Sequence, residues 1–163
     1  MTSNSSRTTF KILVDADSCP VKDIIVRVAE DTATPVVMVA SISHQIGFQS
    51  SGIKVIAVDN IPQAADIAVL NNVTAGDVVV TGDYGLASLV ISKQAMSLSP
   101  RGFIFTNRNI DRLLLQRHVD AKIRRSGGRT KGPKALSMED KKKFETSLRK
   151  LLDRNSPEHP GLA

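Results

Sequence analysis

Short apolar runs alternate with segments of helical periodicity along most of the chain. Apolar runs rich in Val and Ile predict strands at residues 10–14, 36–40, 53–58 and 78–81, with weaker ones at 95–98 and 102–106. Apolar residues that recur every three or four positions predict helices over residues 20–34, 62–71, 84–93, 109–125 and 137–152. Strands that are apolar throughout and alternate with helices indicate a parallel sheet that is covered on both faces.

We therefore expect an α/β fold: a three-layer sandwich with a mostly parallel central sheet and a basic helical C-terminal extension. The length of 163 residues suits one domain, which we place at residues 10–154. The core would span residues 10–106 and the extension 107–154, with flexible tails at 1–9 and 155–163. Within the first helix, Pro20 is expected in the first turn, with Ser18 or Cys19 as the N-cap.

Several classes of protein are excluded by composition. No apolar run approaches the roughly 18 residues of a membrane span. The Ser- and Thr-rich N-terminus lacks the apolar segment of a secretory signal. A lone thiol, Cys19, fits a reducing compartment. We expect a cytoplasmic protein without a membrane partner, and self-association into a homo-oligomer stays open.

Four aspartates follow predicted strands or begin a helix beside one. Asp15 and Asp17 come directly after the first strand, Asp83 follows the fourth, and Asp66 lies four residues after Pro62 at the start of a helix. Ligands of parallel α/β sheets bind beyond the carboxyl ends of the strands, so these acids are candidates for one site. The alternative for each acid is a turn or helix-cap residue that accepts backbone N–H groups.

Carboxylates that converge in one crevice repel each other unless a cation neutralises them. Mg²⁺ or Mn²⁺ prefers carboxylate oxygens, activates water for hydrolysis and stabilises charge on a phosphate oxygen. Asp77 precedes its strand and is expected to be structural. Cys19 has no His near it in sequence and acids beside it, which favours a packing role over a nucleophilic one.

The charge is divided unevenly along the chain. The net charge is +6, yet residues 1–100 hold 6 basic and 9 acidic side chains, whereas residues 101–163 hold 16 basic and 7 acidic ones. A Gly-rich basic segment at residues 126–134 suits phosphate binding, although a solvated connector is the alternative. The predicted nucleic-acid-binding residues are Arg101, Arg124, Arg125, Arg129, Lys131 and Lys134. Tyr84 is the only aromatic residue expected near the acids.

Five segments resemble the bacterial YaiI/YqxD family, in its order and spacing: VDADSCPVK (14–22), AAD (64–66), GDVVVTGDYGLA (76–87), SPRG (99–102) and SGGRTKGP (126–133). The chain departs from the family at Gln63, where members often have an acid. The family resembles PIN-like domains, many of which are divalent-metal-dependent ribonucleases. This resemblance implies that Asp15, Asp17, Asp66 and Asp83 hold the metal.

The leading hypothesis is a metal-dependent nuclease that cleaves RNA with a metal-activated water. Mg²⁺ or Mn²⁺ would be held by Asp15, Asp66 and Asp83, assisted by Asp17, while the basic segment holds the RNA backbone. One alternative is a non-catalytic module that binds nucleic acid or nucleotides. Another is a small-nucleotide phosphatase that uses the same acids.

Overall fold

The computed structural model of the protein describes residues 10–42, 52–128 and 135–154. Within these ranges the strands are β1 (Ile12–Asp15), β2 (Val36–Ser41), β3 (Ile53–Val58), β4 (Val78–Val80), β5 (Met96–Leu98) and β6 (Ile104–Phe105). The helices are α1 (Lys22–Thr32), α2 (Ala64–Asn72), α3 (Tyr84–Ser92), α4 (Asn107–Arg125) and α5 (Met138–Leu152), with a short 3-10 helix η1 (Ala16–Ser18) after β1.

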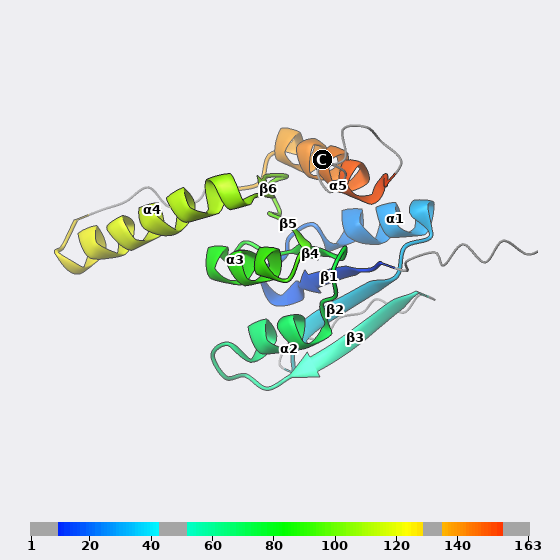
Figure 1. The fold of residues 1–163 in the computed structure, drawn as a ribbon, viewed down its shortest axis with the longest axis horizontal. Helices are drawn as coiled ribbons and strands as arrows, with labels where there is room; N and C mark the ends of the chain where they lie inside the picture. The colour runs from blue at the N-terminus through cyan, green and yellow to red at the C-terminus, as the bar shows by residue number, and fades with distance from the viewer. Residues whose placement is uncertain (1–9, 43–51, 129–134, 155–163) are drawn as a thin grey trace, which may run out of the picture.

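All six strands form one sheet in the order β3-β2-β1-β4-β5-β6 (Figure 1). The first five strands in this order are parallel, and β6 pairs antiparallel with β5. Strands β2 and β3 are added in turn on one side of β1. The chain then returns to the other side of β1, where β4, β5 and β6 are added in turn. The predicted α/β class with a mostly parallel sheet is confirmed.

Alternation along the strands divides the apolar side chains between two layers of helices. On β1, Ile12 and Val14 lie in the core that α1 and α5 cover, whereas Leu13 lies in the core that α2 and α3 cover. Because both faces are covered, the central strands are apolar at nearly every position, as the sequence pattern predicted. The three-layer arrangement follows from this pattern.

Helix α5 belongs to the main core, which the predicted division of core and extension at residue 106 did not anticipate. Phe144, Leu148 and Leu151 are fully buried and pack with residues of β1, β2 and α1. Figure 1 shows α5 beside α1 on the same face of the sheet. Arg27 on α1 pairs with Glu145, and Arg149 pairs with Asp31 at 2.7 Å. Helix α5 is rich in basic residues but amphipathic, and its apolar side completes the layer of helices that contains α1.

Two helices begin later than the sequence predicted. Helix α1 starts at Lys22 with Val21 as its N-cap, so Pro20 precedes it. Ser18, one of the two expected caps, belongs instead to η1, and its hydroxyl donates to the Asp15 carboxylate. Helix α2 starts at Ala64, two residues after Pro62. By contrast, α5 has the predicted start, with a capping box between Ser137 and Asp140.

Helix α4 projects away from the rest of the described structure (Figure 1). Ile110, near its start, is its only fully buried residue, whereas Leu115 is 63% exposed. No helix in the described ranges is long and apolar enough to cross a membrane. The part of the predicted extension that does stand apart from the core is therefore α4.

Replacing Phe144 with Ala should destabilise the whole protein. The fully buried ring fills the core beneath β1, and removing such a ring costs about 3–5 kcal/mol. Urea unfolding followed by circular dichroism would measure this loss. Leu115→Ala, on the exposed part of α4, is the matched control and should change the free energy of unfolding by less than about 0.5 kcal/mol. Equal effects of the two substitutions would contradict the assignment of α5 to the core.

Candidate active site at the carboxyl edge of the sheet

The strand order reverses between β1 and β4, and two of the predicted acids lie at this point. Asp15 is the last residue of β1. Asp83 follows β4 and is the N-cap of α3, where its Oδ1 accepts a hydrogen bond from the Leu86 N–H at 3.1 Å. Connections leave β1 and β4 in opposite directions, so a crevice opens between their carboxyl ends. The predicted convergence of Asp15 and Asp83 at one edge of the sheet agrees with this placement.

Thr81 connects these two aspartates. Its hydroxyl is buried and donates to Asp15 Oδ2 at 3.4 Å, while it accepts the Asp83 N–H at 3.0 Å. Ser18 also donates to Asp15 Oδ2, at 3.3 Å. Thr81 was not among the predicted site residues, although its place directly after a buried strand and before Gly82-Asp83 was a usable signal.

Asp17 and Asp66 line a neighbouring groove of about 350 Å³, on the β2 and β3 side of the crevice. Both carboxylate oxygens of Asp17 accept from the Ser41 N–H, at 3.0 and 3.1 Å, which joins η1 to the end of β2. Asp66 lies in the first turn of α2. Asp59, which the sequence analysis did not consider, lines the same groove.

The carboxylates are close enough to perturb one another. Burial raises the pKa of Asp15, and repulsion from Asp66 and Asp17 adds to this effect, while hydrogen bonds from Ser18 and Thr81 oppose it. Burial likewise raises the pKa of Asp66, with a further contribution from Asp83. Asp66 thus interacts electrostatically with both acids at the switch point, which makes it part of the same cluster.

Arg117 of α4 supplies positive charge to this cluster. Its guanidinium lies 3.4 Å from Asp83 Oδ1, and it lowers the pKa of Asp66. The side chain of Arg117 is 56% exposed, so the pair is weak and open to exchange for another anion. Arg108 and Arg112, which precede Arg117 on the same helix, lie roughly 180° and 140° around the helix axis from it.

The donor chemistry of the cluster fits a hard divalent cation. Within the described ranges, no three His, Cys, Asp or Glu side chains lie close enough together to form a ligand set. Mg²⁺ does not require one, because it keeps several waters and binds through one or two carboxylates plus the phosphates of its substrate. Asp15 and Asp66, whose pKa values are raised by burial and repulsion, are the carboxylates that a cation would stabilise most.

Cys19 and Asp77 have structural surroundings. Cys19 is buried, and chiefly this burial raises the pKa of its thiol, with a smaller contribution from Asp15. A protonated thiol is a poor nucleophile. Asp77 is fully buried at the opposite end of β4, where it accepts from Lys11 Nζ at 2.7 Å and from the Thr74 N–H at 2.8 Å. Both residues match their predicted packing and structural roles.

The predicted nucleic-acid-binding residues are distributed over two parts of the structure and the undescribed segment. Arg101 pairs with Asp140 at 3.0 Å and so holds the start of α5. Arg124 and Arg125 lie in the last turn of α4, far along the projecting helix. Arg129, Lys131 and Lys134 lie outside the described residues. Their role in binding stays a prediction.

Aromatic side chains gather beside the crevice, which the sequence analysis did not foresee beyond Tyr84. Phe105 on β6 packs edge-on against Tyr84 at a centroid separation of 5.6 Å, and against Phe103 at 5.5 Å. The three rings come from two segments that are twenty residues apart in the sequence. Antiparallel pairing of β6 with β5 brings the Phe residues to Tyr84, and this pairing had no sequence signal strong enough to place them.

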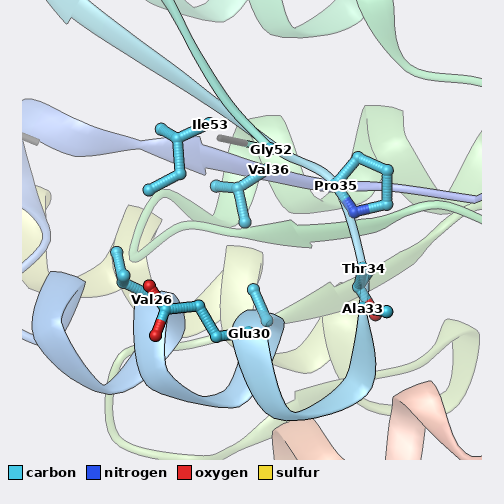
Figure 2. Close-up of a pocket in the computed structure, with 9 residues that line it drawn as sticks. Val26, Glu30, Ala33, Thr34, Pro35, Val36, Gly52 and Ile53 are labelled. Atoms are coloured by element: carbon cyan, nitrogen blue, oxygen red, sulfur yellow. The ribbon is translucent and has the colours of Figure 1, made fainter. Parts of the chain in front are cut away.

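A separate hollow of about 400 Å³ lies at the amino ends of β2 and β3, away from the carboxylates. Figure 2 shows Val26 and Glu30 of α1 on one side and Val36 and Ile53 of the strands on the other. It lies at the edge of the sheet opposite the crevice. We assign the candidate site to the crevice, where the acids, Thr81 and Arg117 meet.

Asp66→Asn should stabilise the protein at pH 7. The raised pKa means that the folded state resists ionisation of Asp66, so removing the charge relieves repulsion. Water screens this partly exposed group, so we expect a gain below about 1 kcal/mol, or roughly 1–3 °C in Tm. The gain should shrink as the pH falls and vanish below the ordinary value of 3.8, since Asp66 of the wild type is protonated there in both the folded and the unfolded state. Thermal unfolding across pH measures it.

Asp77→Asn is the matched control, with the same chemical change at a buried and paired acid. It should destabilise the protein by about 2–3 kcal/mol, because Lys11 loses its partner. If both substitutions change Tm in the same direction, the electrostatic description of the crevice is wrong.

Comparison with known proteins identifies the family. Residues 13–154 match the family described as "Uncharacterized BCR, YaiI/YqxD family". A UPF0178 protein of Natranaerobius thermophilus is 48% identical over 88% of this chain and 96% of its own length. UPF0178 proteins of Bacillus mycoides and Alkaliphilus metalliredigens are 43% and 41% identical over 88% and 94% of this chain, and over 99% and 100% of their own lengths.

Among solved structures, Rae1 (YacP) from Bacillus subtilis aligns over 90% of this chain and 99% of its own, with 19% identity and a TM-score of 0.41. So distant a likeness carries no information about activity. The match over residues 13–154 and the identities above 40% show that this chain belongs to the YaiI/YqxD family.

Proposed function

We propose that the protein is a divalent-metal-dependent nuclease that acts on RNA. The observation that carries the proposal is the coupling of Asp15, Asp66 and Asp83 at the carboxyl ends of β1 and β4. Gathering acids in this way costs stability, and a cation that the acids share is the ordinary compensation. The likeness to PIN-like domains, which the sequence motifs suggest, points to the same activity.

Each residue of the crevice has a distinct part in this proposal. Asp15, Asp66 and Asp83 would hold Mg²⁺ or Mn²⁺, while Asp17 fixes η1 to the end of β2. When bound, the ion would activate a water and neutralise charge on the phosphate. The Thr81 hydroxyl holds the Asp15 carboxylate and the backbone N–H of Asp83, and Arg117 is placed to exchange its weak pair with Asp83 for a phosphate oxygen.

The charge division of the chain supports a polyanionic substrate. The 16 basic side chains of residues 101–163, against 7 acidic ones, would hold the backbone of RNA without regard to sequence. Arg117 connects this basic half to the acidic crevice. A substrate would then have its backbone on the basic half and one phosphodiester at the carboxylates.

Asp15→Asn should abolish cleavage of single-stranded RNA in the presence of Mn²⁺. We expect a loss of at least about 100-fold in rate, because the acid at the centre of the cluster no longer carries charge. Asp120→Asn is the matched control, since Asp120 lies on α4 outside the acidic cluster and accepts a hydrogen bond from the Gln116 side chain. Gel electrophoresis of end-labelled RNA measures the cleavage. Absence of cleavage by the wild type with Mn²⁺ or Mg²⁺ would contradict the proposal.

A non-catalytic binding module is the second candidate. The observation in its favour is that the described acids form no ready ligand set and that Arg117 already pairs with Asp83. Such a module would bind RNA with a steep dependence on salt and no dependence on divalent ions. A phosphatase for small nucleotides would instead hydrolyse mononucleotides and would be indifferent to Arg129→Ala.

A further inference from the structure

An aromatic-lined groove of about 690 Å³ adjoins the carboxylates on the side opposite Asp17 and Asp66. Ser18, which donates to Asp15, and Gly82 and Tyr84, which flank Asp83, form the wall next to the acids. The groove extends from there past the carboxyl ends of β4 and β5 to Phe103 and Phe105. A molecule bound in it would therefore have one end at the crevice.

The rest of the wall is mainly apolar and aromatic. The turn between β5 and β6 brings Phe103 to the groove, where the ring is 36% exposed. The Ser99 hydroxyl fixes this turn, since it accepts from the N–H groups of Arg101 at 3.3 Å and Phe103 at 3.1 Å. Gly102, at φ +85°, packs so closely on α5 that a side chain there would lie 2.7 Å from the backbone of Lys143. The position of Phe103 is thus set by the fold.

The edge-on contacts of Phe103 and Tyr84 with Phe105 support these two rings from behind. Phe105 is 4% exposed and anchors both of them in the small core between α3 and α4. A ring that is supported on its inner side and partly exposed can receive a flat, aromatic guest with little loss of conformational entropy. Bases of single-stranded nucleic acid are bound in this way, by stacking that every base can provide.

The surroundings favour a base that belongs to a nucleic acid strand over an isolated apolar ligand. Arg101, which is 38% exposed and paired with Asp140, lines the groove, and Arg117 lies at the carboxylates, so two guanidinium groups border the aromatic wall. The volume lies within the roughly 300–1,000 Å³ of sites for small molecules. A nucleotide unit needs this combination of aromatic surface for the base and positive charge for the phosphate.

We propose that this groove holds an unpaired base of single-stranded RNA, next to the phosphodiester at Asp15 and Asp83. Phe103 would be the principal stacking residue, with Tyr84 at the end near the carboxylates. The inference rests on the proposed function for its substrate class, but binding in the groove requires no cleavage. It makes the protein selective for single strands, because a base held in a duplex cannot enter the groove.

Fluorescence of 2-aminopurine tests this inference directly. The probe is a ten-nucleotide single-stranded RNA with 2-aminopurine at alternate positions, titrated with the protein in EDTA so that cleavage plays no part. Stacking in the groove should quench the fluorescence. A strand of the same length and charge with stable abasic residues in place of its bases should bind about tenfold more weakly. Neither result would be expected if only the backbone is bound.

The variants separate stacking from charge. Phe103→Ala should lose the quenching and the preference for bases, whereas Phe103→Trp should keep both; Leu115→Ala, on the projecting helix, should behave as the wild type. If Phe103→Ala unfolds at a lower temperature, Phe103→Leu keeps an apolar side chain and removes only the ring. Equal affinity of the wild type for the two RNA strands would overturn the proposal. So would quenching that survives both Phe103→Ala and Phe103→Leu.

The outcomes also separate this inference from the proposed function. Quenching that depends on Phe103, without cleavage in Mn²⁺, would leave the base-binding groove standing and remove the nuclease. Cleavage in Mn²⁺ that is unchanged by Phe103→Ala, without quenching, would leave the nuclease standing and remove the base-binding groove.

Discussion

The central position of β1 is the constraint on which the rest of the structure depends. This strand pairs in parallel with β2 on one side and with β4 on the other, and the connections that follow β1 and β4 lead in opposite directions along the sheet. Both faces of β1 are buried, and its side chains are apolar until Asp15. The first polar side chain therefore emerges at the carboxyl end, at the point where the sheet reverses its order. The candidate site is a consequence of this topology.

The acids at this point are costly, and the neighbouring residues limit the cost. Thr81 and Ser18 donate to Asp15, the N–H of Leu86 donates to Asp83, and Arg117 pairs with Asp83 and opposes the rise in the pKa of Asp66. These contacts leave the pKa values of Asp15 and Asp66 raised. Uncompensated repulsion is common at functional sites, where stability is exchanged for the ability to bind or react. Asp77 is also buried but is paired with Lys11, which shows how the same residue type is accommodated where it is only structural.

The two sides of the crevice differ in chemistry. Toward β2 and β3 the lining is acidic, with Asp17, Asp59 and Asp66, whereas toward β5 and β6 it is aromatic. This division follows from the sheet, because the strands on either side of β1 come from different parts of the chain. A substrate that crosses the crevice would meet carboxylates and aromatic rings in sequence, which suits an alternation of phosphates and bases.

The sequence by itself determined the α/β class, the strands and the placement of Asp15 and Asp83 at strand ends, because these depend on local periodicity and on the carboxyl ends of apolar runs. It also located the start of α5. Only the tertiary structure decided that α5 fills the core, that Arg117 faces Asp83 while Arg108 and Arg112 do not, and that Phe103 joins Tyr84. Each of these is a contact between segments far apart in the chain. Composition and spacing describe single segments, whereas the strand order and the packing of the layers decide which segments meet.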